Sequence, residues 1–209
     1  MPNILVVDDQ EVVRYGTTLI LQKTIEDVQV SNASSFDDSL KMLSSKQFDL
    51  VILDIDMPGG NNHQMLDVIR LRHPEIKILI FSSYDEQIFG WRYLEAGADG
   101  FLSKKTGIEE IKNAVKSLLR DEKYLSPVLK QTLLNNISNK KSNTSNPLDR
   151  LSNRESNIMQ LLIKGTSVAE IAQQLSLQIS TVSTYKKRIC EKLQVSNIVE
   201  MIEKVQLYS

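Results

Sequence analysis

Five short apolar runs, separated by longer amphipathic stretches, dominate the N-terminal half of this chain. Continuous apolar runs bounded by turn residues are typical of strands buried on both faces of a parallel sheet. The stretches between them carry apolar residues at three- and four-residue spacing, which predicts helices. The runs occupy residues 3–7, 28–30, 48–53, 76–81 and 100–103. This alternation predicts a doubly wound α/β domain with a five-stranded parallel sheet.

The two halves of the chain differ in charge, although the net charge is only −1. Residues 1–125 carry 14 Lys and Arg against 20 Asp and Glu, a net charge of −6. Residues 126–209 carry 11 against 6, a net charge of +5. Between the halves, residues 135–147 are almost wholly polar and rich in turn formers, which predicts an interdomain linker. The asymmetry favours cation or phosphate chemistry in the acidic half and a polyanionic partner for the basic half.

The composition also excludes several classes of protein. With 209 residues, 41% of them hydrophobic and 24% charged, the chain is ordinary globular material that can form two modest domains. The start, MPNILVVDD, lacks the basic region of a signal peptide, and no apolar run is long enough to span a bilayer, so we expect a cytoplasmic protein without a membrane partner. The single cysteine, Cys190, excludes an internal disulfide, and no Cys/His cluster indicates zinc.

Polar side chains follow four of the five predicted strands. Asp8 and Asp9 end the first strand and Asp54 the third, while Ser82 and Lys104 end the fourth and fifth. Because ligands of doubly wound sheets bind beyond the carboxyl ends of the strands, we expect these side chains to share one crevice. Carboxylates packed together repel unless a cation joins them, and hard oxygen ligands open to water favour Mg²⁺ over zinc.

Asp54 is the expected centre of this chemistry. Burying a lone charge costs several kcal/mol, so we expect Asp54 at an exposed strand end with a function or a partner. A metal, a lysine and a hydroxyl aimed at one carboxylate are the parts needed to accept a phosphoryl group, because the cations neutralise charge on its oxygens. Asp54 is therefore the predicted nucleophile.

Helix-start patterns divide the rest of the chain. Ser35 precedes an acidic first turn, and capping-box spacing occurs at Thr106 with Glu109, Ser152 with Glu155, and Ser167 with Glu170. The last two pairs begin short helices, and a tight turn then leads into a basic helix, ISTVSTYKKRICEKL. This order predicts a helix-turn-helix. On the basic helix, an apolar face (Val182, Ile189 and Leu193) opposes a polar face that we expect to enter the DNA major groove (Thr184, Lys187, Arg188 and Glu191, with Ser183 at its edge).

The motifs VVDD, LDIDMP, FSS and AGADGFLSK, in this order, resemble the receiver domain of two-component response regulators of the NarL/FixJ type. The C-terminal half resembles their LuxR-type helix-turn-helix, so the resemblance spans essentially the whole chain. It implies a flavodoxin-like receiver at residues 1–122, a linker at 123–147 with a helix at 126–137, and a DNA-binding domain at 148–209.

The resemblance also implies site residues and partners. Its Mg²⁺ ligands would be Asp9, Asp54 and the backbone carbonyl of Asp56, with Asp8 acting through water. Ser82 and Lys104 would contact phosphoryl oxygens, and Phe101 would be the aromatic switch residue. The implied DNA contacts are Thr181, Ser183, Thr184, Lys187 and Arg188, and the last helix would form a dimer face with Ile198, Ile202 and Val205. A sensor histidine kinase would phosphorylate Asp54, and the phosphorylated homodimer would bind paired half-sites in double-stranded promoter DNA.

Two alternatives stay open at this point. The DxD of LDIDMP also resembles the haloacid-dehalogenase phosphohydrolases, but in those the DxD follows the first strand, whereas here Asp8 and Asp9 precede Asp54. The C-terminal half could also be a helical interaction module that binds no DNA, because helix-turn-helix geometry occurs in packing roles too. The reading that accounts for most motifs is a transcription regulator that catalyses only its own phosphoryl transfer and dephosphorylation.

Overall fold

The structure is a computed structural model that describes residues 1–57, 62–139 and 147–208. The chain forms two compact units, residues 1–134 and residues 135–209. The expected linker began at residue 123, whereas residues 123–134 pack within the first unit. Residues 140–146 of that linker lie outside the described residues.

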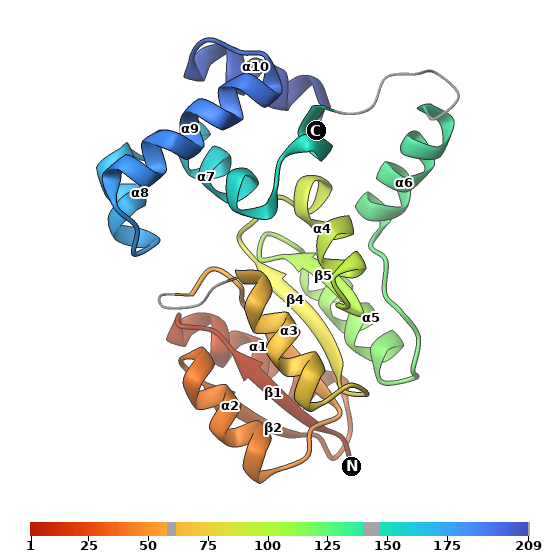
Figure 1. Ribbon diagram of the computed structural model, residues 1–209. Helices are drawn as coiled ribbons and strands as arrows, with labels where there is room; N and C mark the ends of the chain where they lie inside the picture. The colour runs from red at the N-terminus through yellow and green to blue at the C-terminus, as the bar shows by residue number, and fades with distance from the viewer. Residues whose placement is uncertain (58–61, 140–146, 209) are drawn as a thin grey trace. The chain divides into compact units, whose positions relative to one another are not determined.

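The first unit is built on a five-stranded parallel sheet, as predicted (Figure 1). Its strands are β1 (Asn3–Val7), β2 (Gln29–Ala33), β3 (Leu50–Leu53), β4 (Lys77–Ser82) and β5 (Gly100–Ser103). Their spatial order is β2-β1-β3-β4-β5. The strand order therefore reverses direction beside β1, the kind of position at which ligands bind in this architecture.

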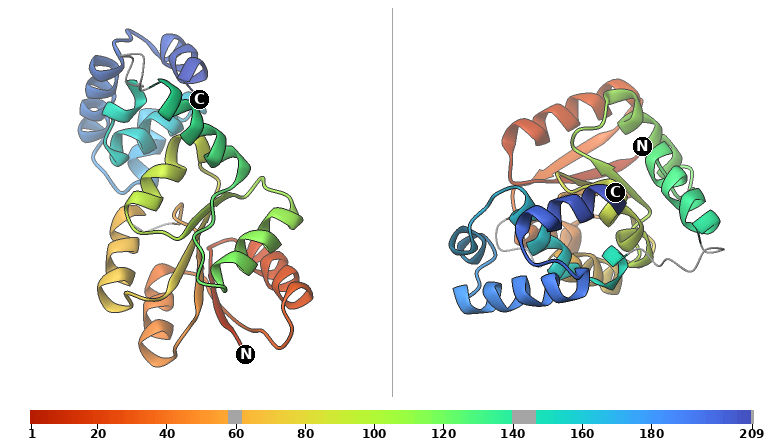
Figure 2. Two further views of the ribbon diagram at one scale, coloured as in Figure 1. Left: turned by 90° about the vertical axis from the view of Figure 1, so that its right-hand side faces the viewer. Right: turned by 90° about the horizontal axis from the view of Figure 1, so that it is seen from above.

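Helices cover both faces of the sheet. They are α1 (Glu11–Thr24), α2 (Phe36–Ser45), α3 (Asn62–Arg72), α4 (Glu86–Glu95) and α5 (Ile108–Leu118). Helices α1 and α5 lie on one face and contact each other, and α2, α3 and α4 lie on the other (Figures 1 and 2). The alternate residues of the strands therefore pack against two helical layers, which explains why the inner strands β1 and β3 are almost wholly apolar, whereas the edge strand β2 is mostly polar.

One of the two N-terminal capping predictions in this unit is confirmed and the other is wrong. The Ser35 hydroxyl oxygen accepts a hydrogen bond from the Asp38 amide at 3.2 Å, as expected for a cap. Helix α5 instead begins after Gly107, which has no side chain to cap it. Thr106 thus lies one residue too early to cap, and its amide donates to the Ser103 carbonyl in the preceding turn.

The second unit contains only helices among its described residues. They are a 3-10 turn at Pro147–Arg150, α7 (Asn153–Ile163), α8 (Val168–Gln174), α9 (Ile179–Leu193) and α10 (Ile198–Tyr208). Both predicted capping boxes are present, at Ser152 with Glu155 and at Ser167 with Glu170. Helix α6 (Pro127–Asn139) connects the units along the chain, close to the predicted range.

Candidate functional site

Three carboxylates meet at the carboxyl ends of β1 and β3. Asp8, Asp9 and Asp54 each offer an oxygen within 4.8 Å of the others, so the three could hold a metal ion. Asp9 is exposed, whereas Asp8 and Asp54 are only 2% and 1% exposed. The expectation that Asp54 is exposed is therefore wrong. Its burial is possible because a cation lies beside it.

That cation is Lys104, which follows β5. Its ammonium lies 2.6 Å from Asp54 Oδ2 and 2.7 Å from Asp8 Oδ2, so one lysine bridges two buried carboxylates. The Lys104 backbone amide donates to the Ser82 carbonyl at 2.8 Å, which fixes the end of β5 against β4. The convergence of Asp8, Asp54 and Lys104 that the strand ends predicted is thus observed.

Burial and pairing act in opposite directions on the charges of this pair. Burial raises the pKa of the Asp54 carboxyl above its ordinary value, against the opposing effect of the Lys104 hydrogen bond. Burial alone lowers the pKa of Lys104, but its hydrogen bonds with Asp54 and Asp8 outweigh that effect and raise it. Lys104 is therefore a permanent cation at neutral pH, placed where negative charge would gather.

Backbone and side-chain donors orient the acidic cluster. The Gln10 amide donates to Asp8 Oδ1 at 2.8 Å, and the Asp56 amide donates to Asp54 Oδ1 at 2.9 Å. The guanidinium of Arg14 donates to the Asp8 carbonyl oxygen at 2.7 Å, which ties α1 to the loop that carries the cluster. The sequence did not predict the role of Arg14, because nothing in its helix indicates a hydrogen bond to the backbone of Asp8. That the Asp56 carbonyl is a metal ligand stays a prediction.

Ser82 and Tyr84 connect β4 to the cluster. Ser82 is fully buried, and its Oγ accepts a hydrogen bond from the Tyr84 amide at 3.3 Å. The Tyr84 hydroxyl reaches across to donate to Asp56 Oδ1 at 3.1 Å, and its ring lies 4.9 Å from that of Phe89 in α4. Tyr84 thus contacts both the loop after β3 and the helix after β4.

Phe101 is fully buried in β5, with its ring 5.9 Å from that of Tyr93 in α4. This contact packs β5 against α4, and Phe101 has no hydroxyl with which to form a hydrogen bond. The switch role that the resemblance gives Phe101 stays a prediction.

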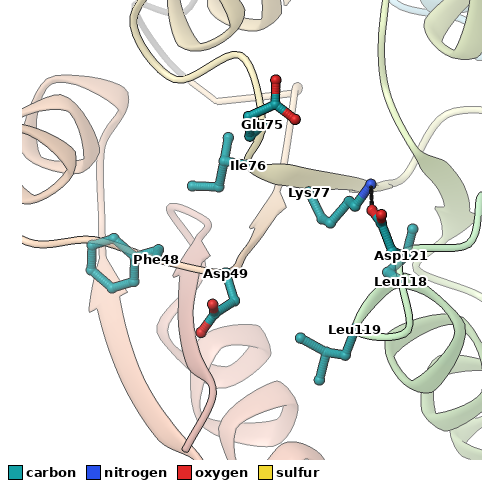
Figure 3. Close-up of a pocket in the computed structure, with 8 residues that line it drawn as sticks. All are labelled: Phe48, Asp49, Glu75, Ile76, Lys77, Leu118, Leu119 and Asp121. Carbon is teal, nitrogen blue, oxygen red and sulfur yellow. Dashed lines mark ion pairs between the residues drawn. The ribbon is translucent and has the colours of Figure 1, made fainter.

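A cavity of about 320 Å³ lies at the opposite edge of the sheet, where β3 and β4 begin. Phe48, Ile76 and Leu119 supply apolar lining, and Lys77 forms an ion pair with Asp121 beside them (Figure 3). The acidic cluster lies at the carboxyl ends of the strands, so this cavity is not part of that site.

In the second unit, α8, a short turn and α9 form the helix-turn-helix. The turn contains Ser176 with a positive φ of 52°, and the Leu177 amide donates to the Ala172 carbonyl at 2.8 Å. Val182, Ile189 and Leu193 are fully buried, as the helical pattern predicted. The opposite face of α9 exposes Ser183, Thr184, Lys187, Arg188 and Glu191, while Thr181 and Lys186 are half-buried. The expected reading face is therefore open to a partner.

The predicted dimer face on α10 is only partly available. Ile198 and Ile202 are half-buried, but Val205 is only 6% exposed, so its side chain packs inside the protein. Val199 on the same helix is 65% exposed. Val205 lies one turn after the fully buried Met201, so this face of α10 points to the core and Val205 is not available at the surface.

Within the described part of the chain, no helix combines the length and the apolar character needed to cross a membrane.

Comparison with known proteins assigns both units. Residues 4–116 match the family described as response regulator receiver domain, and residues 149–205 match the bacterial regulatory proteins of the luxR family. Response regulator GacA of Pseudomonas viridiflava is 35% identical over 202 residues, which cover 96% of this chain and 94% of GacA. Response regulator UvrY of Escherichia coli K12 is 33% identical, over 96% of this chain and 92% of UvrY.

A solved structure with similar folds is RcsB from Salmonella enterica serovar Typhimurium, bound to promoter P1flhDC with a beryllium fluoride phosphomimetic. It is 25% identical, covers 97% of both chains and superposes with a TM-score of 0.69.

Proposed function

This chain belongs to the response regulators of the NarL/FixJ type, in which a receiver domain precedes a LuxR-type DNA-binding domain, and we propose that phosphorylation of Asp54 controls its binding to promoter DNA. The observation that carries the proposal is the Lys104 ammonium held between the Asp8 and Asp54 carboxylates at the strand ends. A buried nucleophilic carboxylate beside a permanent cation is suited to accept a phosphoryl group.

The donor set at the cluster fits Mg²⁺. Three carboxylate oxygens within 4.8 Å supply hard ligands, and the exposure of Asp9 leaves room for coordinated water. Asp9, Asp54 and the Asp56 carbonyl would hold the ion, with Asp8 acting through water. Bound there, Mg²⁺ would neutralise negative charge on the phosphoryl oxygens.

The chain's own residues perform the transfer. An Asp54 carboxylate oxygen attacks the phosphorus while the bond from phosphorus to a kinase histidine nitrogen breaks, so the phosphoryl group moves without net gain or loss of electrons. Lys104 stays protonated and neutralises charge on the transferred group. The Ser82 hydroxyl donates to a phosphoryl oxygen, and its Oγ can at the same time accept the hydrogen bond from the Tyr84 amide. The product is the phosphorylated protein itself, and the reaction does not convert a separate substrate.

The basic half is the proposed DNA-binding part. Polar and cationic side chains on α9, among them Ser183, Thr184, Lys187 and Arg188, are exposed and would enter the major groove, with Thr181 beside them. The RcsB complex with promoter DNA supports this assignment through the shared fold. We restrict the proposed dimer face to Ile198, Ile202 and the exposed Val199, because Val205 is buried. Since genomic DNA is the partner, we expect the protein in the cytoplasm.

Intact-mass measurement after incubation with acetyl phosphate and Mg²⁺ tests the acceptor. Wild type should gain the mass of one phosphoryl group, and Asp54→Asn should gain none. Asp56→Asn is the matched control, because it removes the same charge two residues away and leaves the nucleophile in place. Full labelling of Asp54→Asn would refute the assignment.

A further inference from the structure

The second helix of the helix-turn-helix, α9, exposes one of its four aliphatic side chains. Val182, Ile189 and Leu193 are fully buried, whereas Ile179 is 58% exposed. Single exposed apolar residues are common on protein surfaces and need no partner. Ile179 differs from them in its place, because it is the first residue of α9 and follows the tight turn after α8 (Figure 1). This place, and not the exposure alone, indicates a contact with a partner.

The start of α9 is the part of a helix-turn-helix that lies nearest to the bases of DNA. The second helix of such a motif lies in the major groove, and residues at its N-terminal end contact the base edges. Each Cα–Cβ bond of a helix is tilted toward the N-terminus, so a side chain in the first turn projects past the helix start. When α9 lies in the groove, Ile179 is therefore among the side chains closest to the bases.

The neighbours of Ile179 leave its side chain accessible. Residues four apart lie on one side of a helix, so the next side chain on this flank is Ser183, which is exposed and short. Because helical side chains lean toward the preceding turn, a long residue at position 183 would lie over Ile179, but a serine cannot cover it. Ser180 beside it is also small and exposed. This flank of α9 can therefore approach another surface closely.

Thr184 gives a second reason to expect apolar contacts with DNA. Its hydroxyl donates a hydrogen bond to the Ser180 carbonyl at 2.9 Å, so the hydroxyl proton is used inside the helix. In this arrangement Thr184 presents an acceptor oxygen and a methyl group to the bases, but no donor. One of the side chains proposed to contact bases thus has no proton to donate, which increases the share of apolar contact in recognition.

Thymine carries the group that an apolar side chain can recognise in the major groove. Its C5-methyl group distinguishes it there from the other bases, and apolar side chains contact this methyl group. We propose that Ile179 contacts the C5-methyl group of one thymine in each half-site and so favours thymine at that position. This inference rests on the proposed function and adds one base that the DNA-binding unit recognises.

Deoxyuridine provides a test that changes a single methyl group. It pairs as thymidine does but lacks the C5-methyl group, so the thymines of a DNA fragment can be replaced one at a time. The fragment is a genomic DNA that the full-length protein binds, and affinity is measured with beryllium fluoride and Mg²⁺ present. For wild type, replacement of one particular thymine in a half-site should weaken binding about fourfold, as expected when one methyl group loses its burial.

Ile179→Ala should remove this preference for thymine. Its affinity for the unmodified fragment should be about tenfold below that of wild type, because the apolar side chain no longer lies against the DNA. Replacing the thymine should then cause no further loss, since the two changes remove the same contact. The slope of log affinity against log salt should equal that of wild type, because no phosphate contact is lost. Ile179→Val, which lacks one methyl group, should respond to deoxyuridine less than wild type and more than Ile179→Ala.

Leu71→Ala is the matched control for the loss of an exposed aliphatic side chain. Leu71 lies in α3 of the receiver, is 86% exposed and has a side chain isomeric with that of isoleucine. This variant should keep the affinity of wild type and the response of wild type to deoxyuridine.

The contrary results separate this inference from the proposed function. Equal affinity of wild type for the unmodified fragment and for every deoxyuridine fragment would overturn the inference alone. A response that persists at full size in Ile179→Ala would also overturn it, because another side chain would then contact the methyl group. Failure of wild type to bind any genomic fragment would overturn the proposed function and this inference with it.

Discussion

The Tyr84 hydroxyl donates a hydrogen bond to the Asp56 carboxylate at 3.1 Å, although the two residues follow different strands. Asp56 is exposed, and its amide is bound to the buried Asp54. An acid that water can reach therefore lies two residues from the carboxylate that would carry the phosphoryl group, with its side chain held by the Tyr84 hydroxyl.

Asp56 is expected to shorten the lifetime of the phosphorylated state by orienting an attacking water. Asp56→Ala should lengthen the phosphoryl half-life by roughly two- to tenfold, below the full range of general base catalysis because the group is solvated. Tyr84→Phe removes the hydroxyl that holds the Asp56 carboxylate, so its phosphoryl half-life should fall between those of wild type and Asp56→Ala. The decay of the phosphorylated mass gives each half-life. Faster loss of phosphate from Asp56→Ala would contradict the role.

Arg70 and Asp99 stabilise the receiver at the far edge of the sheet. The Arg70 guanidinium pairs with Asp99 and donates to the Gly97 carbonyl at 2.7 Å, and Asp99 also accepts from the Ile78 amide at 2.9 Å. Asp99→Asn should lower the free energy of unfolding by about 2–4 kcal/mol, because it leaves a largely buried guanidinium without its anion. Urea unfolding followed by the fluorescence of Trp91, the chain's single tryptophan, measures this.

Asp121→Asn is the control for that experiment. Asp121 forms an ion pair with Lys77, but the Asp121 side chain is 86% exposed. Its loss should cost less than about 1 kcal/mol, since solvent screens exposed ion pairs. If Asp99→Asn lowers the free energy of unfolding no more than Asp121→Asn does, the pair of Arg70 and Asp99 does not stabilise the receiver.

The strands and the acidic cluster could be predicted from the sequence, because both follow from local patterns of residues. Parallel strands share one edge for their carboxyl ends, so the meeting of Asp54 and Lys104 could be predicted without coordinates. The hydrogen bond from Tyr84 to Asp56 could not be predicted, since it depends on how the loops after β3 and β4 pack. The capping box at Thr106 failed because its spacing is common and α5 starts one residue later.

Glu155 and Lys192 form an ion pair that joins α7 to α9, with 2.6 Å between Oε2 and Nζ. Burial acts to raise the pKa of Glu155, but hydrogen bonds from Lys192 and Ser152 outweigh it and hold the pKa below the ordinary value of 4.5. Because the folded pKa is the lower one, the stabilisation is complete above pH 4.5 and is lost as the pH falls through the folded pKa.

Glu155→Gln keeps a residue suited to the capping box but removes the charge. At pH 7 it should destabilise the second unit by about 1–2 kcal/mol, a range reduced for the partial exposure of Lys192, and the difference should shrink as the pH falls through the folded pKa, which lies below 4.5. Amide exchange of α9, corrected for the intrinsic rate at each pH, reports it. Glu170→Gln, at the same capping position of α8, should change little at either pH. A pH-independent loss in Glu155→Gln would show that the ion pair contributes nothing.

Lys187 tests the reading face of α9. Its side chain is 80% exposed and only 3.9 Å from Glu191, a weak pair that DNA can displace. Lys187→Ala should weaken promoter binding, and a salt titration shows how. A lost phosphate contact lowers the slope of log affinity against log salt by roughly one. A lost base contact instead costs about 1–3 kcal/mol of binding free energy and weakens the base preference at one position of the DNA site. Thr184→Ala should do only the latter.

Lys23→Ala is the control for the loss of charge, because it removes one lysine from the receiver. It should leave DNA affinity unchanged over the whole salt range. Wild-type affinity in Lys187→Ala at every salt concentration would mean that α9 is not the reader.

The central claim is that the occupied Asp54 tightens DNA binding. The most direct measurement is the affinity of the full-length protein for a genomic DNA fragment that it binds. The affinity is measured with and without beryllium fluoride and Mg²⁺, for wild type and for Asp54→Asn. The account predicts that beryllium fluoride tightens binding by wild type and leaves Asp54→Asn unchanged, because only an intact Asp54 carboxylate can hold the phosphoryl mimic. Equal affinity of wild type in both conditions, or the same tightening in Asp54→Asn, would contradict it.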